Sequence, residues 1–480
     1  MSRFSQQKFR KKSRSSQKSA RRDTALAKNA APLEVTISHI GGRGDGVGQA
    51  DYTHNYQTKT HMVFVPDTLP GERVIIQPTH LSGQGITGQM TELLDASDDR
   101  KSPDCGASPA CGGCQFQHMK PHAYQSWKET QLKIILEKSG ISPAKWEASF
   151  FSPLAARRRA RLALRRRQDD VIIGFRERAS HHIIPPTDCT ILAPEIITVI
   201  SQLQQDLLLA LTPGMTGEVE ITLCDNGSDV TLVSDQSWDS GIITDLTSRA
   251  TLSQDIIRLS LLDRTDKKSA LPLLLITRHN PVISWSLPEG CITNAVKLYP
   301  APLTFLQADR AAESEMRHHI FASLQGYDKV LDLFAGSGTL SSSLLYQPTP
   351  PTKLAAYDNA KTALASFEAL AHAGGFSMNF SAQYRNLFDA PLTDKELDGF
   401  EACIIDPPRA GAAAQMPALA NSQLKRIIMV SCNPHSFARD AAILCEAGWH
   451  CKWARHIDQF VMTSHSEIIA CFDNPHAIDA

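Results

Sequence analysis

The C-terminal third of the chain alternates apolar, strand-like runs with helical segments in a regular way. The strand-like runs are Val330–Phe334, Leu354–Asp358, Ala402–Asp406, Arg426–Cys432 and Glu467–Phe472. Repeated β-α units are typical of a mainly parallel, doubly wound sheet, so we expect a Rossmann-like α/β domain over residues 301–480. Ligands of such sheets bind beyond the carboxyl ends of the strands. The residues that follow each run are therefore the first candidates for a functional site.

The rest of the 480 residues has different patterns and leaves room for further domains. Over residues 32–95, Gly and Pro separate short apolar runs, which predicts a five-stranded β-barrel of the oligonucleotide-binding kind; a barrel without a ligand is the alternative. Residues 96–300 are expected to form a mostly β central domain. Within it, the helical spacing of Leu132, Ile135 and Leu136 predicts a helix between Tyr124 and Ser139. Part of 115–140 is expected to pack on the C-terminal domain.

Charge is unevenly distributed along the chain, although the formal net charge is only -1. Residues 1–22 hold nine of the 49 cations and no acid, which leaves 40 cations against 50 acidic residues in the remainder. We expect residues 1–31 to be a disordered basic tail that is attracted to polyanions. A solubilising tail and a mitochondrial transit peptide are the alternatives.

Neither a secretory signal nor an apolar run of the ~20 residues that a membrane span needs is evident. The 11 cysteines are an odd number, which argues against a disulfide-stapled fold. We therefore expect a cytoplasmic protein in a reducing compartment, without membrane contact.

A glycine-containing loop follows the first strand-like run of the C-terminal domain. Gly336 and Gly338 allow a tight turn and a close approach of ligand to backbone, but Ser341 stands where a dinucleotide fingerprint needs its third Gly. Asp332, just before the loop, favours a cationic ligand over a pyrophosphate. S-adenosylmethionine, with its sulfonium and ammonium groups, fits this pattern better. The expected cofactor residues of the loop are Asp332, Phe334, Gly336, Gly338 and Thr339.

Two polar residues after the next strands complete the expected cofactor site. Asp358 is placed to accept hydrogen bonds from ribose hydroxyls, and a helix N-cap is its alternative role. Asn386, after the third strand, is a candidate for reading the adenine.

Asp406 and Cys432 each follow a buried strand, so both are expected to face the cofactor. Cysteines within strands are usually small buried hydrophobes, and we interpret Cys403, Cys445 and Cys471 in this way. Cys432 differs because it stands past the apolar run and before Asn433, where a thiol can reach a substrate. We expect backbone N–H groups there to favour its thiolate.

Four cysteines in the central domain are candidates for a metal centre, namely Cys105, Cys111, Cys114 and Cys189. Four thiolates can hold zinc or an iron–sulfur cluster. Zinc ribbons usually contain two C-x-x-C pairs, whereas the fourth cysteine stands alone here. The spacing therefore favours iron–sulfur weakly, and both metals stay open.

Residues 157–167 contain seven arginines in eleven positions. If the apolar residues between them face the core of a strand, the arginines form a stripe suited to phosphates. The expected RNA-binding residues are Arg157, Arg159, Arg161 and Arg165, and a solvated strand face is the alternative.

Five motifs, in this order, resemble the RNA 5-methyluridine methyltransferase family, typified by ribosomal uridine C5 methyltransferases with an N-terminal TRAM barrel and an iron–sulfur cluster. The resemblance extends from about residue 33 to about 472. The motifs are Phe305-Leu306-Gln307, Asp332 to Gly338, Asp406-Pro407-Pro408-Arg409-Ala410-Gly411, Ser431-Cys432-Asn433-Pro434, and Asp458-Gln459-Phe460 with Thr463, His465 and Glu467.

This resemblance implies a class I, S-adenosylmethionine-dependent methyltransferase that forms 5-methyluridine in RNA. Cys432 would add to carbon 6 of the uracil, and Glu467 would remove the proton from carbon 5. Asp406 would hold the uracil edge and lie at the cofactor, while Gln307 would contact the cofactor or the base. The four clustered cysteines would hold a structural [4Fe–4S] cluster.

The implied substrate is large-subunit ribosomal RNA, because bacterial tRNA-specific relatives generally lack the barrel and the cluster. The target base would have to swing out of the RNA fold to reach the thiol. A monomer is expected. The alternatives are a tRNA uridine C5 methyltransferase, a cytosine C5 methyltransferase and a non-catalytic, metal-stapled RNA-binding protein.

Overall fold

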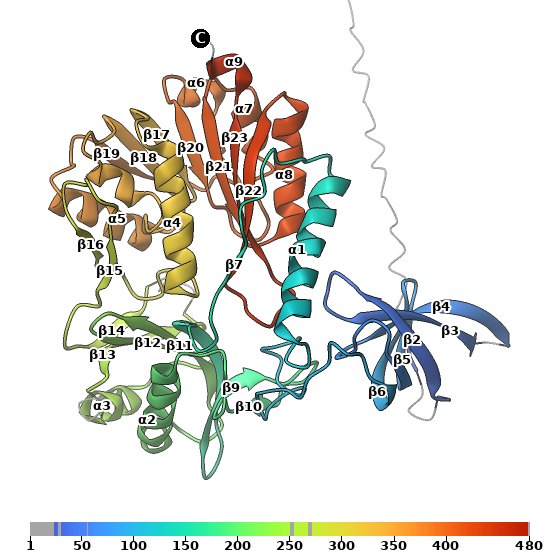
Figure 1. Cartoon of the computed structure of the whole chain (residues 1–480). Helices are drawn as coiled ribbons and strands as arrows, with labels where there is room; N and C mark the ends of the chain where they lie inside the picture. Colours follow the sequence, from blue (N-terminus) through green and yellow to red (C-terminus); the bar gives the residue numbers. More distant parts are fainter. Residues whose placement is uncertain (1–23, 27–29, 55, 250–253, 267–270, 479–480) are drawn as a thin grey trace, which may run out of the picture. The chain divides into compact units, whose positions relative to one another are not determined.

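The structure is a computed structural model that describes residues 24–26, 30–54, 56–249, 254–266 and 271–478 (Figure 1). It consists of two compact units, residues 1–100 and 101–480, which are considered separately. Nearly all of the predicted basic tail lies outside the described residues. Among the described helices, none is both long and apolar enough to cross a bilayer.

The first unit contains a closed five-stranded barrel, as predicted. Its strands are β2 (Leu33–Ile40), β3 (Gly46–His54), β4 (Gln57–Val65), β5 (Arg73–Ser82) and β6 (Gly85–Asp95). They follow the order β5-β2-β3-β4-β6, and β6 pairs again with β5 to close the barrel. Only the β4–β6 pair is parallel among these five strands. A short strand, β1 (Thr24–Ala25), pairs with β5. Aliphatic side chains fill the interior: Val35, Ile37, Val63, Val65, Val74, Ile76 and Ile86.

A seven-stranded sheet in the order β10-β9-β8-β11-β12-β13-β14 forms much of the central part of the chain. Its strands are β8 (Arg159–Arg166), β9 (Val171–Arg176), β10 (Ile183–Ile184), β11 (Thr216–Cys224), β12 (Gly227–Ser234), β13 (Ile256–Asp263) and β14 (Leu273–Thr277). The predicted β-rich character is thus confirmed. Two helices, α2 (Pro194–Ala210) and α3 (Ser240–Arg249), were not predicted, and both contribute to the core of this sheet.

The C-terminal sheet has eight strands in the order β19-β18-β17-β20-β21-β23-β22-β7. Their bounds are β17 (Lys329–Leu333), β18 (Lys353–Asp358), β19 (Phe380–Tyr384), β20 (Ala402–Ile405), β21 (Arg426–Ser431), β22 (His450–Asp458), β23 (Glu467–Asp473) and β7 (Phe150–Phe151). The predicted parallel, doubly wound sheet is confirmed for β17 to β21. At the C-terminal end the sheet is not parallel, because β23 runs antiparallel to both β21 and β22.

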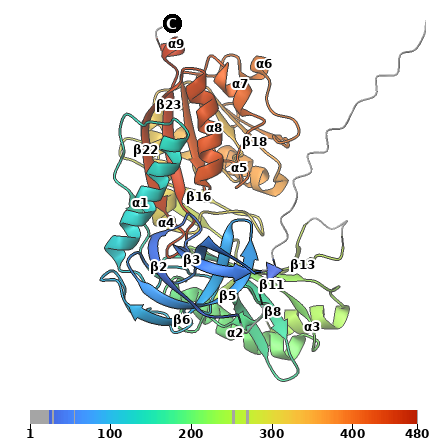
Figure 2. The same ribbon diagram turned by 90° about the vertical axis from the view of Figure 1, so that its right-hand side faces the viewer.

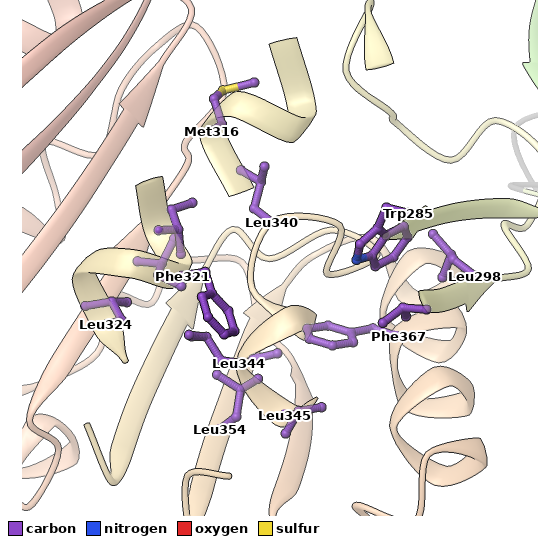
Figure 3. Packing of buried hydrophobic residues seen from close by; sticks show 14 of the residues in the cluster. Trp285, Leu298, Met316, Phe321, Leu324, Leu340, Leu344, Leu345, Leu354 and Phe367 are labelled. Carbon is purple, nitrogen blue, oxygen red and sulfur yellow. The ribbon is translucent and has the colours of Figure 1, made fainter. Parts of the chain in front are cut away.

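Helices cover both faces of this sheet. One face is covered by α4 (Arg310–Leu324), α5 (Lys361–Ala373) and the 3₁₀ helix η1 (Ser342–Tyr346), and the β15–β16 hairpin (Ile283–Ser286, Ala295–Leu298) packs there too. Figure 3 shows this core, in which Trp285 and Leu298 of the hairpin lie near Phe367 of α5. The other face is covered by α1 (Pro121–Lys138), α6 (Asp394–Leu397), α7 (Met416–Ala420) and α8 (Pro434–Glu446), while α9 (Pro475–Ile478) follows β23.

Helix α1, which comes long before the C-terminal domain in the sequence, lies beside α8 in this second layer (Figures 1 and 2). Its residues Tyr124, Lys128, Leu132 and Leu136 recur every four positions and are buried. Leu132 and Leu136 share a core with Phe437 of α8, which explains why a helix forms there with this spacing.

Candidate active site

The predicted catalytic residues meet at one edge of the C-terminal sheet. Asp406 follows β20 and Cys432 follows β21, so the parallel strands deliver both to their carboxyl edge. Glu467 is the first residue of β23, and the antiparallel direction of this strand brings its start to the same edge. Ser431 pairs with Ile468, which places Glu467 next to Cys432 across the β21–β23 ladder.

Burial and mutual repulsion control the ionisation of the carboxyl groups at this edge. Burial raises the pKa of Asp332 to about 7, and the neighbouring carboxylates of Asp406 and Asp358 act in the same direction. The pKa values of Asp406 and Glu467 are raised by burial and by other carboxylates nearby. The site therefore gathers acidic groups that a cationic ligand would stabilise in their ionised form.

The expectation that the thiolate of Cys432 is favoured is wrong for the free protein. Burial raises the pKa of the thiol to about 12, and the negative charges of Glu467 and Asp406 contribute. Backbone donors and Arg409 act in the opposite direction but are outweighed. The thiol proton must therefore leave at the moment of reaction, and the buried carboxylates beside it are the groups placed to accept it.

A chain of side-chain amides connects the two carboxyl groups of the site. Gln307 Nε2 donates to Asp406 Oδ2 at 3.4 Å, and Gln459 Nε2 donates to Gln307 Oε1 at 2.6 Å and to Glu467 Oε2 at 2.6 Å. Gln459 Oε1 accepts from the backbone N–H of Ala308 at 2.8 Å. Gln459 thus orients Glu467 and Gln307 together. Sequence reasoning gave it no role, although it stands in the Asp458-Gln459-Phe460 motif.

The predicted cofactor loop adopts the tight, partly left-handed backbone that its glycines allow. Phe334, Gly336 and Gly338 have φ angles of 61°, 54° and 73°. A Cβ added at Gly338 would lie 2.4 Å from the ring of Phe367, so this close approach requires glycine. Nothing lies within 4 Å of a Cβ added at Gly336, so the loop borders open space where a ligand can lie. A 3₁₀ helix follows the loop in place of the expected α-helix.

The carboxylate of Asp358 holds this loop against β18. Its Oδ2 accepts from the N–H of Gly336 at 2.9 Å and its Oδ1 accepts from the N–H of Ala360 at 2.7 Å. The second bond does not cap the helix, because α5 begins at Lys361 with Ala360 as its N-cap, so the alternative role of Asp358 as an N-cap is wrong. Below the loop, the buried carboxyl of Asp332 accepts from the hydroxyl of Ser341. Thr339 is buried, and its carbonyl accepts from Arg317 Nε at 2.9 Å.

Asn386 shapes the turn after β19. Its Nδ2 donates to Asp389 at 2.5 Å and its Oδ1 accepts from the N–H of Phe388 at 3.1 Å. This turn places the ring of Phe388 5.5 Å from that of Phe334, which belongs to the cofactor loop. Phe388 is 40% exposed and was missed by sequence reasoning, since a lone aromatic after a strand gives no signal of its own.

A cavity of about 630 Å³ lies beside Cys432. One part of its wall consists of Cys432, Arg409, Phe460 and His465, and another of the four clustered cysteines with Arg157 and Arg178. The candidate nucleophile and the candidate metal ligands therefore border one cavity.

The four clustered cysteines are free thiols that influence one another electrostatically. Burial, together with the charges of Cys189, Cys111 and Cys105, raises the pKa of Cys114 to about 11. The donor set suits a thiolate-bound metal, and N–H groups point at two of its sulfurs: Gly113 N lies 3.4 Å from Cys111 Sγ, and Gln117 Nε2 lies 3.5 Å from Cys114 Sγ. In the described part of the chain, however, no set of three or more His, Cys, Asp or Glu residues is arranged to hold a metal ion. The metal centre stays a prediction.

The arginine stripe on β8 has the predicted orientation, but acidic partners on β11 neutralise part of it. Arg159 pairs with Glu220 at 2.5 Å and Arg161 with Glu218 at 2.6 Å. Arg165 is exposed and, among the described residues, pairs with none. Arg157 instead lines the cavity of Cys432, and its contact with RNA, like those of the others, stays a prediction.

Comparisons with known proteins bear on this geometry. A family model described as tRNA (Uracil-5-)-methyltransferase matches residues 353–472. An uncharacterized RNA methyltransferase of Mesorhizobium japonicum is 32% identical over 446 residues, which is 92% of this chain and 98% of that protein. A 23S rRNA (uracil(1939)-C(5))-methyltransferase of Yersinia enterocolitica is 29% identical over 448 residues, 92% of this chain and 95% of that protein.

Among solved structures, the tRNA (uracil-54, C5)-methyltransferase of Pyrococcus abyssi, in complex with S-adenosyl-L-homocysteine, superposes with a TM-score of 0.67 at 19% identity. The match covers 92% of this chain and 100% of that chain. This likeness establishes a shared fold.

Proposed function

Since the chain belongs to the family of S-adenosylmethionine-dependent RNA (uracil-5-)-methyltransferases, we propose that it methylates carbon 5 of a uridine in large-subunit ribosomal RNA. The observation that carries the chemistry is the placement of Cys432 and Glu467 side by side on β21 and β23, with Asp406 at the same edge. The reaction requires a nucleophile for carbon 6 and a base for the proton on the neighbouring carbon 5.

Cys432 starts the reaction by attacking carbon 6 of the flipped-out uracil. As the Sγ–C6 bond forms, the thiol proton passes to the carboxylate of Asp406, and the C5=C6 electron pair moves toward C5 and the O4 oxygen. The raised pKa values of Asp406 and Glu467 make these carboxylates better proton acceptors than ordinary ones. Bound S-adenosylmethionine supplies an electrophilic methyl group on its sulfonium.

Glu467 completes the reaction once carbon 5 carries the methyl group. Its carboxylate removes the C5 proton, the C5–H electron pair forms the C5=C6 double bond, and the C6–Sγ bond breaks as Sγ takes back the proton that Asp406 held. Gln459 holds Glu467 by a 2.6 Å hydrogen bond, and Gln307 extends from Gln459 toward Asp406. This arrangement keeps the base within reach of C5 while Asp406 holds the uracil edge.

The loop after β17 is proposed to bind the cofactor. Asp332 and Asp406 would stabilise its positive charges, and Asp358 would accept hydrogen bonds from the ribose. The ligand would lie against the backbone at Gly336. The aromatic pair Phe334 and Phe388 would enclose the adenine. Asn386 would support this site through its turn, with a base contact as a second role.

We expect the affinity for S-adenosylmethionine to rise with pH as Asp332 ionises. The pKa of this carboxyl is about 7 in the free protein, so below that pH it is neutral and cation binding must displace a proton. Isothermal titration calorimetry from about pH 6 to about pH 8 measures the affinity. For one displaced proton, the affinity should rise by at most about tenfold per pH unit. In Asp332→Asn, which keeps the Ser341 hydrogen bond, the dependence should flatten; an unchanged slope would exclude Asp332 as its source.

The choice of ribosomal RNA rests on relatives named for 23S rRNA that align with 92% of this chain. The tRNA enzyme of Pyrococcus abyssi shares the fold and makes tRNA the alternative. Incubation of the pure protein with labelled S-adenosylmethionine and unmodified ribosomal RNA or tRNA, followed by nucleoside mapping, tests the proposal. Label in 5-methyluridine of 23S rRNA is expected. Label in 5-methyluridine of tRNA would show that tRNA, and not ribosomal RNA, is the substrate. Label in cytidine alone, or no label, would overturn the proposed function.

We also propose that Cys105, Cys111, Cys114 and Cys189 hold a [4Fe–4S] cluster. The cluster would have a structural role, holding together the segments that line the cavity beside Cys432, and would take no part in electron transfer. The purified protein is expected to absorb visible light and to contain about four iron and four sulfide per chain. Cys114→Ser should lose both, whereas Cys291→Ser, in the β15–β16 hairpin, should keep them. Stoichiometric zinc without sulfide would identify the alternative centre.

The barrel is proposed to act as a TRAM-type RNA-binding module, and the protein is proposed to be a cytoplasmic monomer.

Arg165 is proposed to contact RNA phosphate together with Arg157, Arg159 and Arg161. Arg165→Gln should weaken RNA binding about equally for all sequences and lower the salt slope by about 1. Filter binding at several salt concentrations measures both. The control is Lys329→Gln, because Lys329 is the first residue of β17 and belongs to a different sheet from Arg165. A wild-type salt slope in Arg165→Gln would contradict the assignment.

A further inference from the structure

We propose that Lys128 and Tyr124 of α1 are positioning residues that hold the β22–β23 loop, residues 459–466, so that Gln459 and Glu467 meet the substrate. The inference rests on the proposed roles of Cys432 and Glu467. It assigns a function to a helix that lies more than 300 positions away in the sequence.

Lys128 ties the two ends of the loop together. Its side chain is fully buried, and Nζ lies 2.9 Å from Oδ1 of Asp458, the last residue of β22. The same ammonium donates to the backbone carbonyl of His465, two positions before Glu467. One side chain therefore fixes the distance between the strand that precedes the loop and the strand that carries the base.

Tyr124 holds the middle of the same loop. Its hydroxyl donates to Asp458 Oδ2 at 2.5 Å and accepts from the N–H of Met462 at 3.0 Å. Met462 has a φ of 62°, a left-handed conformation that a residue with a side chain adopts only at a cost. Such a conformation persists where the surroundings determine it, and here the helix supplies the partner.

The segment directly after Cys114 binds the loop from a second side. The carbonyl of Met462 accepts from the N–H groups of Gln115 at 2.6 Å and Phe116 at 3.2 Å, and Gln115 Oε1 accepts from the N–H of Ser464 at 2.7 Å. The strained residue is thus bound at both its N–H and its carbonyl. Residues 115–128 thus bind the loop at Met462, Ser464 and His465, and bind Asp458 directly before it.

Stability alone gives little reason for a charged pair at this place. A buried ion pair is often no more stabilising than apolar residues of the same shape, because removing both charges from water is costly. The pair of Lys128 and Asp458 does, however, fix a loop geometry that packing of α1 through Leu132 and Leu136 leaves undetermined. That geometry sets where Gln459 and Glu467 lie.

The two halves of the reaction depend on this loop to different degrees. Addition uses Cys432, which follows β21 and is not one of the residues that Lys128 and Tyr124 bind. Elimination uses Glu467, which must reach the C5 proton so that its electron pair can form C5=C6 and release Sγ. A displacement of about 1 Å costs about 10²-fold in rate. Loosening the loop should therefore slow elimination more than addition.

Two variants test the proposal with the full-length protein. Tyr124→Phe removes one hydroxyl and keeps the ring, and Lys128→Met removes the charge at similar length. Both are expected to lower kcat by about 10-fold to 10²-fold, with KM for RNA unchanged, and to accumulate the covalent protein–RNA adduct on denaturing gels. Lys133→Met, on the exposed side of α1, is the matched control and should behave as wild type.

The outcomes separate the positioning role from others. Wild-type turnover in Tyr124→Phe, or a fall in turnover without adduct accumulation, would overturn the inference. If thermal unfolding shows that Lys128→Met does not fold, Tyr124→Phe decides alone. A wild-type protein that forms neither 5-methyluridine nor a Cys432-dependent adduct would instead refute the proposed function, so the two failures are distinguishable.

Discussion

Replacing Cys432 with alanine is expected to abolish formation of 5-methyluridine, with a fall in turnover of at least about 10⁴-fold. Carbon 5 of uracil is a weak nucleophile, and the thiol is the group that makes it reactive by adding to carbon 6. The variant should also form no covalent adduct with RNA. Its affinity for S-adenosylmethionine should stay near that of wild type, because the proposed cofactor contacts lie on other strands. Single-turnover assays with labelled cofactor measure the loss.

Cys445→Ala is the control for this prediction. Cys445 is half-buried on α8, lies away from the sheet edge and has no proposed role. It should keep wild-type turnover. Formation of 5-methyluridine by Cys432→Ala at a rate within tenfold of wild type would show that another group initiates the reaction.

Replacing Glu467 with glutamine is expected to stop the reaction after methyl transfer. The amide keeps the shape and the hydrogen bond to Gln459 but does not remove the C5 proton, so turnover should fall by about 10²-fold to 10⁴-fold. Addition through Cys432 is still available, and a methylated covalent adduct should accumulate in proportion to the enzyme. Denaturing gels with labelled RNA measure the adduct, and nucleoside analysis measures the missing product.

Glu446→Gln, at the exposed end of α8, is the matched control and should form no persistent adduct. Full turnover by Glu467→Gln would assign the base to another residue.

Turnover of the wild-type protein should rise with pH. Burial and nearby carboxylates raise the pKa of Glu467, and this base is active only when it is ionised.

Strand periodicity and the carboxyl-edge rule were sufficient to locate Asp406 and Cys432 from the sequence. Both residues directly follow apolar runs that form parallel strands, so their convergence follows from the topology. Glu467 was identified only by its motif. Its strand runs antiparallel, and a residue at the start of an antiparallel strand is outside the rule, although the reversed direction brings it to the same edge.

Contacts between distant segments could not be predicted in this way. Lys128 and Asp458 are separated by 330 positions, and neither the helical spacing of α1 nor the β22 pattern indicates their pairing. The role of Gln459 depends in the same way on its contacts with Gln307 and Glu467. The raised pKa of Cys432 was also beyond the sequence, because it depends on burial and on carboxylates delivered by other strands.

The arginines of residues 157–167 have different roles in the structure, because each has different neighbours. Arg158 is buried and pairs with Glu313 at 3.0 Å, so it supports the fold from within. Arg161 faces outward as predicted but has Glu218 as a partner on β11. A strand pattern predicts which arginines face solvent, but it does not contain the acids of the adjacent strand.

The most direct test of this account is peptide mapping of the covalent complex that Glu467→Gln forms with RNA and S-adenosylmethionine. After digestion of protein and RNA, mass spectrometry is expected to find a uridine nucleotide with one added methyl group on the peptide that contains Cys432. A nucleotide attached to a different residue, or no adduct in a variant that has lost turnover, would contradict the roles assigned to Cys432 and Glu467.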